Sequence, residues 1–112
     1  MPRGMHPVAR RFWHDHAPKL ERLGILTEVD GPAFAMMATH WAIAFDAARL
    51  IRDEGIVAVD ENGAPRKHPM LQVLRDNSTA FRQYAAEFGL TPSARTRLDI
   101  QEPEANDGYF GF

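Results

Sequence analysis

The chain has 112 residues, of which 45% are hydrophobic and 25% charged, and its formal net charge is −2. This length predicts one domain with a small core, a size at which assembly with other subunits often adds stability. The absence of cysteine excludes disulfides, a thiol nucleophile and cysteine-based zinc sites. No stretch of the sequence has the length and apolarity of a signal peptide or a membrane span, so we expect a cytosolic protein.

The first predicted helix runs from about Pro7 to Leu23 and belongs to a basic N-terminal part, since residues 1–27 carry a net charge of +3. Its expected apolar contacts are Val8, Phe12, Ala17, Leu20 and Leu23. Pro18 predicts a kink or a division into two short helices, because proline lacks a backbone N–H and crowds the preceding turn. Four basic side chains of this helix are candidates for contacts with DNA phosphates: Arg10, Arg11, Lys19 and Arg22.

The second predicted helix opens with a capping box at Thr27 and Asp30 and runs to about Glu54. Two apolar seams follow it, one through Phe34, Met37, Trp41, Ala44, Ala48 and Ile51, the other through Met36, His40, Ile43, Ala47 and Leu50. The seams are offset by two residues, which is about 200° around a helix, so they lie on nearly opposite faces.

A helix that is apolar on opposite faces needs cover on both, and two other long helices can hardly supply it. Either this is the central helix of a tight bundle, or a second subunit covers one face. We expect the second arrangement, with an oligomer interface formed by Phe34, Met37, Trp41, Ile43, Leu50 and Ile51.

A small β-hairpin is predicted near residues 56–67, because Asn62-Gly63 lies between two short extended segments. A third helix is predicted from His68-Pro69 to Phe88. The predicted helices end at Gly24, Gly55 and Gly89, each followed by an apolar residue that we expect to fold back on the last turn.

Thr91-Pro92 repeats the signal for a helix start, so we expect a short C-terminal helix that fixes the direction of Arg95 and Arg97. These two arginines are candidates for binding DNA or for bridging neighbouring subunits. The fold class is therefore mainly α, a bundle of three main helices plus this short helix and one hairpin, with residues 1–98 as the domain for oligomerisation and DNA engagement.

Residues 99–112 form an acidic tail with a net charge of −4 and three aromatic side chains near its end, Tyr109, Phe110 and Phe112. Such a segment is typical of chains that fold onto a partner, and the same aromatics can also pack on their own domain. A basic N-terminal part and an acidic tail suggest two different partners.

Catalytic and metal-binding patterns are missing from the sequence. His14 and His16 point to different sides of a helix, so we interpret them as a surface pair and not as metal ligands. His40 lies among Met and Ala residues, which favours a core or interface position over a catalytic base. No phosphate loop, nucleophile elbow or zinc-protease motif is present, so we expect neither an enzyme nor a cofactor.

Four stretches resemble the phage terminase small subunit family of cos-type tailed phages and prophages: WHDHAPKLERLGILTEVD (13–30), AARLIRDEGIV (47–57), NGAPRKHPMLQVLRD (62–76) and FRQYAAEFGLTPSARTRL (81–98). The resemblance implies a mostly helical, non-enzymatic packaging factor that assembles into a homo-oligomeric ring in the host bacterial cytoplasm. It also implies recognition of double-stranded viral DNA and recruitment of the large terminase subunit, which supplies the ATPase and nuclease. The acidic, aromatic tail is the expected docking segment for that subunit.

Two other interpretations remain open from the residues alone. One is a small dimeric helical regulator that reads a DNA palindrome, although no helix shows an obvious polar and basic recognition face. The other is a helical interaction module that does not bind nucleic acid.

Overall fold

The computed structural model describes residues 1–90. Its elements, in chain order, are α1 (Pro7–Arg22), a 3-10 turn η1 (Glu28–Asp30), α2 (Gly31–Glu54), β1 (Val57–Val59), β2 (Pro65–Lys67) and α3 (Met70–Glu87). The mainly helical fold with one small antiparallel hairpin is as predicted. The predicted short C-terminal helix and the tail lie outside the described residues.

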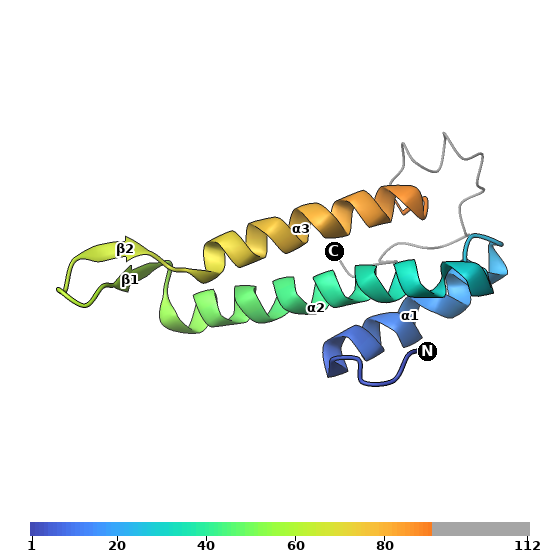
Figure 1. Ribbon diagram of the computed structural model, residues 1–112, viewed down its shortest axis with the longest axis horizontal. Helices are drawn as coiled ribbons and strands as arrows, with labels where there is room; N and C mark the ends of the chain where they lie inside the picture. The colour runs from blue at the N-terminus through green and yellow to red at the C-terminus, as the bar shows by residue number, and fades with distance from the viewer. Residues whose placement is uncertain (91–112) are drawn as a thin grey trace.

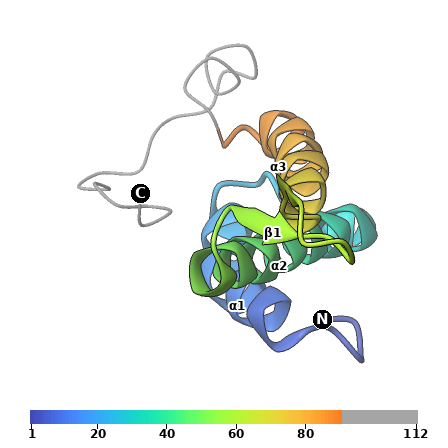
Figure 2. The same cartoon turned by 90° about the vertical axis from the view of Figure 1, so that its left-hand side faces the viewer.

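The long helix α2 is the centre of the fold, with α1 and α3 packed on different sides of it (Figures 1 and 2). Helix α1 lies only along the N-terminal half of α2, whereas α3 runs along most of its length. The end of α2, the start of α3 and the hairpin therefore extend beyond α1 as a two-helix arm.

The core lies where all three helices meet and is built around aromatic rings. The ring centroid of Phe12 lies 5.9 Å from that of Phe34, 5.5 Å from that of Trp41 and 5.8 Å from that of Phe81. Since aromatic pairs at these distances add to the energy of area burial, this cluster ties α1 to both other helices. Fully buried Leu20 and Met37 fill the space beside it.

Helix α1 is one unbroken helix with Pro18 inside it, so the predicted division into two short helices is wrong. Pro18 is exposed, and its ring therefore displaces no core side chain. The predicted apolar contacts Phe12, Ala17 and Leu20 are buried, and Ala9 joins them.

The predicted capping box at the start of the second helix is present. The Asp30 carboxylate accepts hydrogen bonds from the Thr27 backbone N–H at 3.1 Å and from the Thr27 hydroxyl at 2.9 Å. The first turn is a 3-10 turn, however, and α2 proper begins at Gly31.

Strands β1 and β2 pair in antiparallel register, with Val59 opposite Pro65. The turn is held by Asp60, whose carboxylate accepts hydrogen bonds from the backbone N–H groups of Asn62 at 2.8 Å and Ala64 at 2.9 Å. Gly63 takes a φ of +82°, which suits the left-handed residue that closes a three-residue hairpin loop.

Two of the predicted glycine stops share one geometry and the third does not. At Gly24 the next residue, Ile25, donates its N–H back to the Leu20 carbonyl at 2.9 Å, and Leu90 after Gly89 does the same to Ala85 at 2.8 Å. After Gly55 the chain turns directly into the hairpin, and Ile56 is 62% exposed. The expected folding back of Ile56 onto α2 is therefore wrong.

Candidate functional site

The four basic side chains predicted to contact DNA belong to α1 and lie away from the core. Arg10, Arg11 and Arg22 are exposed, and Lys19 is half-buried. Arg11 and Arg22 are eleven residues apart, so they share one side of the helix about 16 Å from each other. Lys19 and Arg22 lie in the last turn, where positive charge also stabilises the helix dipole.

A second basic pair lies on the hairpin. Arg66 and Lys67 are exposed on β2, at the tip of the two-helix arm and far along the molecule from α1 (Figure 1). The fold therefore does not bring these two groups of basic residues together within one chain. The predicted site residues Arg95 and Arg97 lie outside the described residues.

The residues predicted to form an oligomer interface have different places in the fold. Phe34 and Met37 are fully buried within the single chain, so the structure assigns them to the core and not to an interface. Trp41, Leu50 and Ile51 are half-buried, and Ile43 is 39% exposed.

The exposed part of the second seam is a stripe along one side of α2. Met36 is 47% exposed, and Ile43 and Leu50 follow it at intervals of seven residues, which places all three on one side of the helix. Two other residues of the same seam are covered, since Ala47 is buried and His40 contacts Asn77 of α3. Within the described residues α3 therefore covers part of this seam, and the predicted cover by a second subunit stays a prediction.

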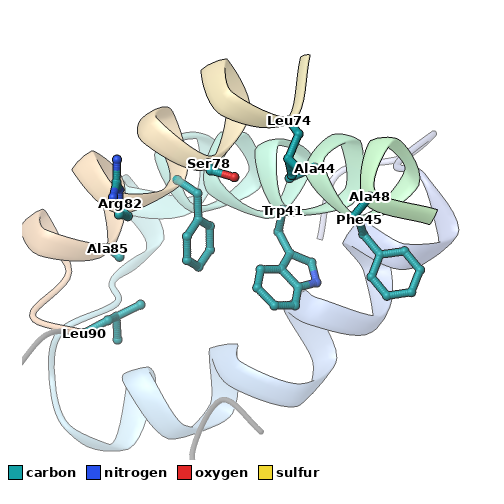
Figure 3. Close-up of a pocket in the computed structure, with 10 residues that line it drawn as sticks. Trp41, Ala44, Phe45, Ala48, Leu74, Ser78, Arg82, Ala85 and Leu90 are labelled. Atoms are coloured by element: carbon teal, nitrogen blue, oxygen red, sulfur yellow. The ribbon is translucent and has the colours of Figure 1, made fainter. Parts of the chain in front are cut away.

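An apolar groove lies between α2 and α3, and its lining includes Trp41 and Phe81, which Phe12 of α1 contacts (Figure 3). It has a volume of about 480 Å³, and its lining comprises Trp41, Ala44, Phe45, Ala48, Leu74, Ser78, Phe81, Arg82, Ala85 and Leu90. Phe45 is 51% exposed at one side of the groove. Sequence reasoning missed this groove, because its walls come from two helices whose pairing is not visible in the chain order.

His16 is buried in the core against Phe12, with ring centroids 4.5 Å apart, so the predicted surface pair of His14 and His16 is wrong. Burial, helped by the positive charge of nearby Lys19 and opposed by Asp15, lowers the pKa of His16 to about 4. The imidazole is therefore neutral at physiological pH.

His40 connects α2 to α3 through a polar contact. Its Nδ1 lies 2.8 Å from Asn77 Oδ1, and the Asn77 amide donates to the Val73 carbonyl at 2.8 Å. Since that amide assignment leaves Oδ1 as the acceptor, His40 Nδ1 carries the proton. The ring also stacks on Tyr84 with centroids 5.8 Å apart, which gives His40 a structural role between helices.

Within residues 1–90 no three His, Cys, Asp or Glu side chains are grouped to hold a metal ion. In the same part of the chain no helix is both long and apolar enough to cross a membrane. The predicted docking residues Tyr109, Phe110 and Phe112 lie outside the described residues.

Comparison with known proteins is consistent with the resemblance seen in the sequence. The family described as phage terminase, small subunit, matches residues 9–105, which include every described helix and the hairpin apart from the first two residues of α1. No curated protein and no solved structure matches the chain. A family match over this much of the sequence shows that the chain belongs to the phage terminase small subunit family and has a role in phage packaging.

Proposed function

We propose that this protein recognises double-stranded viral DNA and brings it to the large terminase subunit at the start of genome packaging. The family is generally the non-catalytic component of a terminase, and the large subunit would supply the ATPase and nuclease. The observation that carries the proposal is the position of Arg10, Arg11 and Arg22 on the outer side of α1. Side chains placed in this way can bind phosphates without disturbing the core.

The DNA contact is tested by neutralising Arg11 and Arg22, which share one side of α1. The double variant Arg11→Gln/Arg22→Gln removes two phosphate contacts, so the slope of log affinity against log salt concentration falls by about 2. A matched control, Arg75→Gln/Arg82→Gln, removes the same charge from two exposed side chains of α3 beside the groove. Equal slopes for the first variant and the wild type would place the DNA site elsewhere, with Arg66 and Lys67 on the hairpin as the next pair to neutralise.

We further propose that the protein works as a homo-oligomeric ring in the bacterial host cytoplasm, with the exposed stripe of α2 in the subunit interface. Met36 and Ile43, with half-buried Leu50 beside them, offer an apolar surface that residues 1–90 leave exposed, of the kind that marks association sites. In a ring each basic α1 surface is repeated, which multiplies weak contacts with a single DNA.

The ring is tested by the mass of the protein in solution, measured by light scattering on a sizing column. A single species of many subunits agrees with the proposal, and Ile43→Lys should reduce it to smaller species because a charge enters the apolar contact. Gln83→Lys, on the exposed side of α3, is the control. A monomer or dimer for the wild type would contradict the ring.

The recruitment of the large subunit is proposed for the tail residues Tyr109, Phe110 and Phe112. Pull-down of a large terminase subunit with the wild type and with a variant in which these three residues are serine is the direct test. Loss of binding with the variant agrees with the proposal, whereas unchanged binding would move the docking segment elsewhere.

A further inference from the structure

We propose that the apolar groove between α2 and α3 is the binding site for the protein's own acidic, aromatic tail, residues 99–112. This inference goes beyond the proposed function, because neither DNA recognition nor recruitment of the large subunit requires a ligand in this groove. Three features of the chain support it: the chemistry of the groove, its charged border, and the point where the chain leaves it.

The floor of the groove is aromatic, and no side chain of residues 1–90 fills it. Trp41 and Phe45 from α2 lie on the same side as Leu90 (Figure 3), and Phe81 from α3 packs on Trp41 with ring centroids 5.3 Å apart. A groove of about 480 Å³ is within the size range of ligand pockets and can take aromatic side chains. Aromatic side chains bound in the groove could make offset or edge-to-face contacts with its aromatic residues, the geometries that aromatic pairs favour.

The border of the groove is basic. Arg82 lines it, and Arg75 lies seven residues earlier on the same side of α3. Arg52 is four residues after the groove residue Ala48 on α2, and its side chain is 75% exposed, with Nε 3.4 Å from Asp53 Oδ1. Arg82 and Arg75 therefore supply most of the positive charge. The tail has four acidic and no basic residues, so its charge is opposite to that of the border.

The position of Leu90 makes the tail the nearest available ligand. Leu90 is the last described residue and itself lines the groove, so the remaining chain starts at one end of this surface. The nineteen residues from there to Tyr109 can span roughly 60 Å when extended, whereas the groove from Leu90 to Leu74 follows about 24 Å of α3. The tail can therefore return along the groove and place its aromatic end there.

Docking of the tail covers the aromatic residues proposed to bind the large subunit. A large subunit would then have to compete with the groove, so the tail would be exposed only when a partner is present. That consequence depends on the proposed function, whereas the docking itself does not.

The experiment uses the full chain, which has no cysteine, so one introduced cysteine can be labelled selectively. Gly111→Cys, between the two terminal phenylalanines, takes a nitroxide label, and Trp13→Phe leaves Trp41 in the groove as the only tryptophan. A nitroxide quenches tryptophan fluorescence only near contact, so we expect Trp41 emission to fall at least threefold relative to the same molecule with its nitroxide reduced. Equal emission in the two states would overturn the proposal.

Two groove variants test where the tail binds. Ala48→Glu puts a negative charge on the groove wall and should abolish the quenching, while Gln83→Glu, on the exposed side of α3, should leave it unchanged. Loss of quenching in both variants, or in neither, would overturn the assignment to this groove. If Trp13→Phe does not fold, the same difference between the two variants is measured with both tryptophans present.

Dilution distinguishes the chain's own tail from that of a second copy. Labelled chains are refolded with a tenfold excess of unlabelled chains that carry Trp13→Phe and Trp41→Phe. Unchanged quenching agrees with a tail bound to its own chain. Loss of quenching on dilution would show that the groove receives the tail of a neighbouring copy and would overturn the proposal.

Discussion

His68 Nε2 lies 2.8 Å from Glu54 Oε1, which joins the start of α3 to the end of α2 beneath the hairpin. His68 Nδ1 also accepts the backbone N–H of Met70 at 3.0 Å, so Nε2 carries the proton and donates it to Glu54. His6 repeats the arrangement at the start of α1, where Nδ1 accepts from Val8 at 3.0 Å and Nε2 lies 2.9 Å from Asp46. Each histidine precedes a proline and ties a helix start to a carboxylate of α2.

Replacement of His68 should destabilise the fold more than replacement of its partner. His68→Ala removes a buried helix cap and a hydrogen bond, which together contribute about 2 kcal/mol. Glu54→Gln should cost less than about 1 kcal/mol, because glutamine still accepts from Nε2 and the Glu54 side chain is 57% exposed. Urea midpoints at constant m-value measure both changes, and equal costs would contradict this account.

The buried His16 should make stability depend on pH. Its pKa is about 4 in the folded chain and 6.5 in the unfolded chain. At a pH between these two values the unfolded chain therefore binds a proton that the folded chain does not. The free energy of unfolding therefore falls as pH falls from about 6.5 towards 4, by about 3 kcal/mol in total. Urea titrations at several pH values should show this fall in the wild type and in His14→Phe, and a clearly smaller one in His16→Phe. The same slope in His16→Phe would contradict the assignment.

Two glycines should respond to alanine to different extents. Gly24 has a φ of +74° and Gly31 a φ of −52°, while at either position a Cβ would meet no atom within 4 Å outside the adjacent residues. Gly24→Ala should cost about 1–2 kcal/mol from the backbone conformation alone. Gly31→Ala should change the free energy of unfolding by less than about 0.5 kcal/mol, because the freedom that the unfolded chain loses is offset by crowding of the new Cβ against the ring of Pro32. Thermal unfolding of both variants gives the comparison, and equal losses would contradict it.

The aromatic cluster and the groove should differ in their importance for stability. Phe12 is 3% exposed and contacts rings from both other helices, so Phe12→Ala should cost about 3–5 kcal/mol. Phe45 is 51% exposed in the groove, and Phe45→Ala should cost less than about 1 kcal/mol. Chemical denaturation followed by circular dichroism checks both values, and a large cost for Phe45→Ala would show that the groove is part of the core.

Helix boundaries were predictable to within a few residues, because they depend on local chemistry. The glycine stops and the capping box act through backbone conformation and hydrogen bonds between near neighbours. The third helix begins at Met70, one residue after the predicted first position Pro69, and the His68 side chain caps the free N–H of Met70. Sequence reasoning did not recognise that His6-Pro7 and His68-Pro69 are the same signal.

The sequence by itself determined the order and limits of the helices, the hairpin and the family. Only the tertiary structure decided which of the apolar and ionisable side chains are covered. Phe34 and Met37 became core, Ile43 stayed exposed and His16 was buried, because burial depends on where α1 and α3 lie along α2. Helix α1 begins beside Asp46, so the last turns of α2 are left without it, and Ala48, at the end of the groove that we assign to the tail, is exposed there.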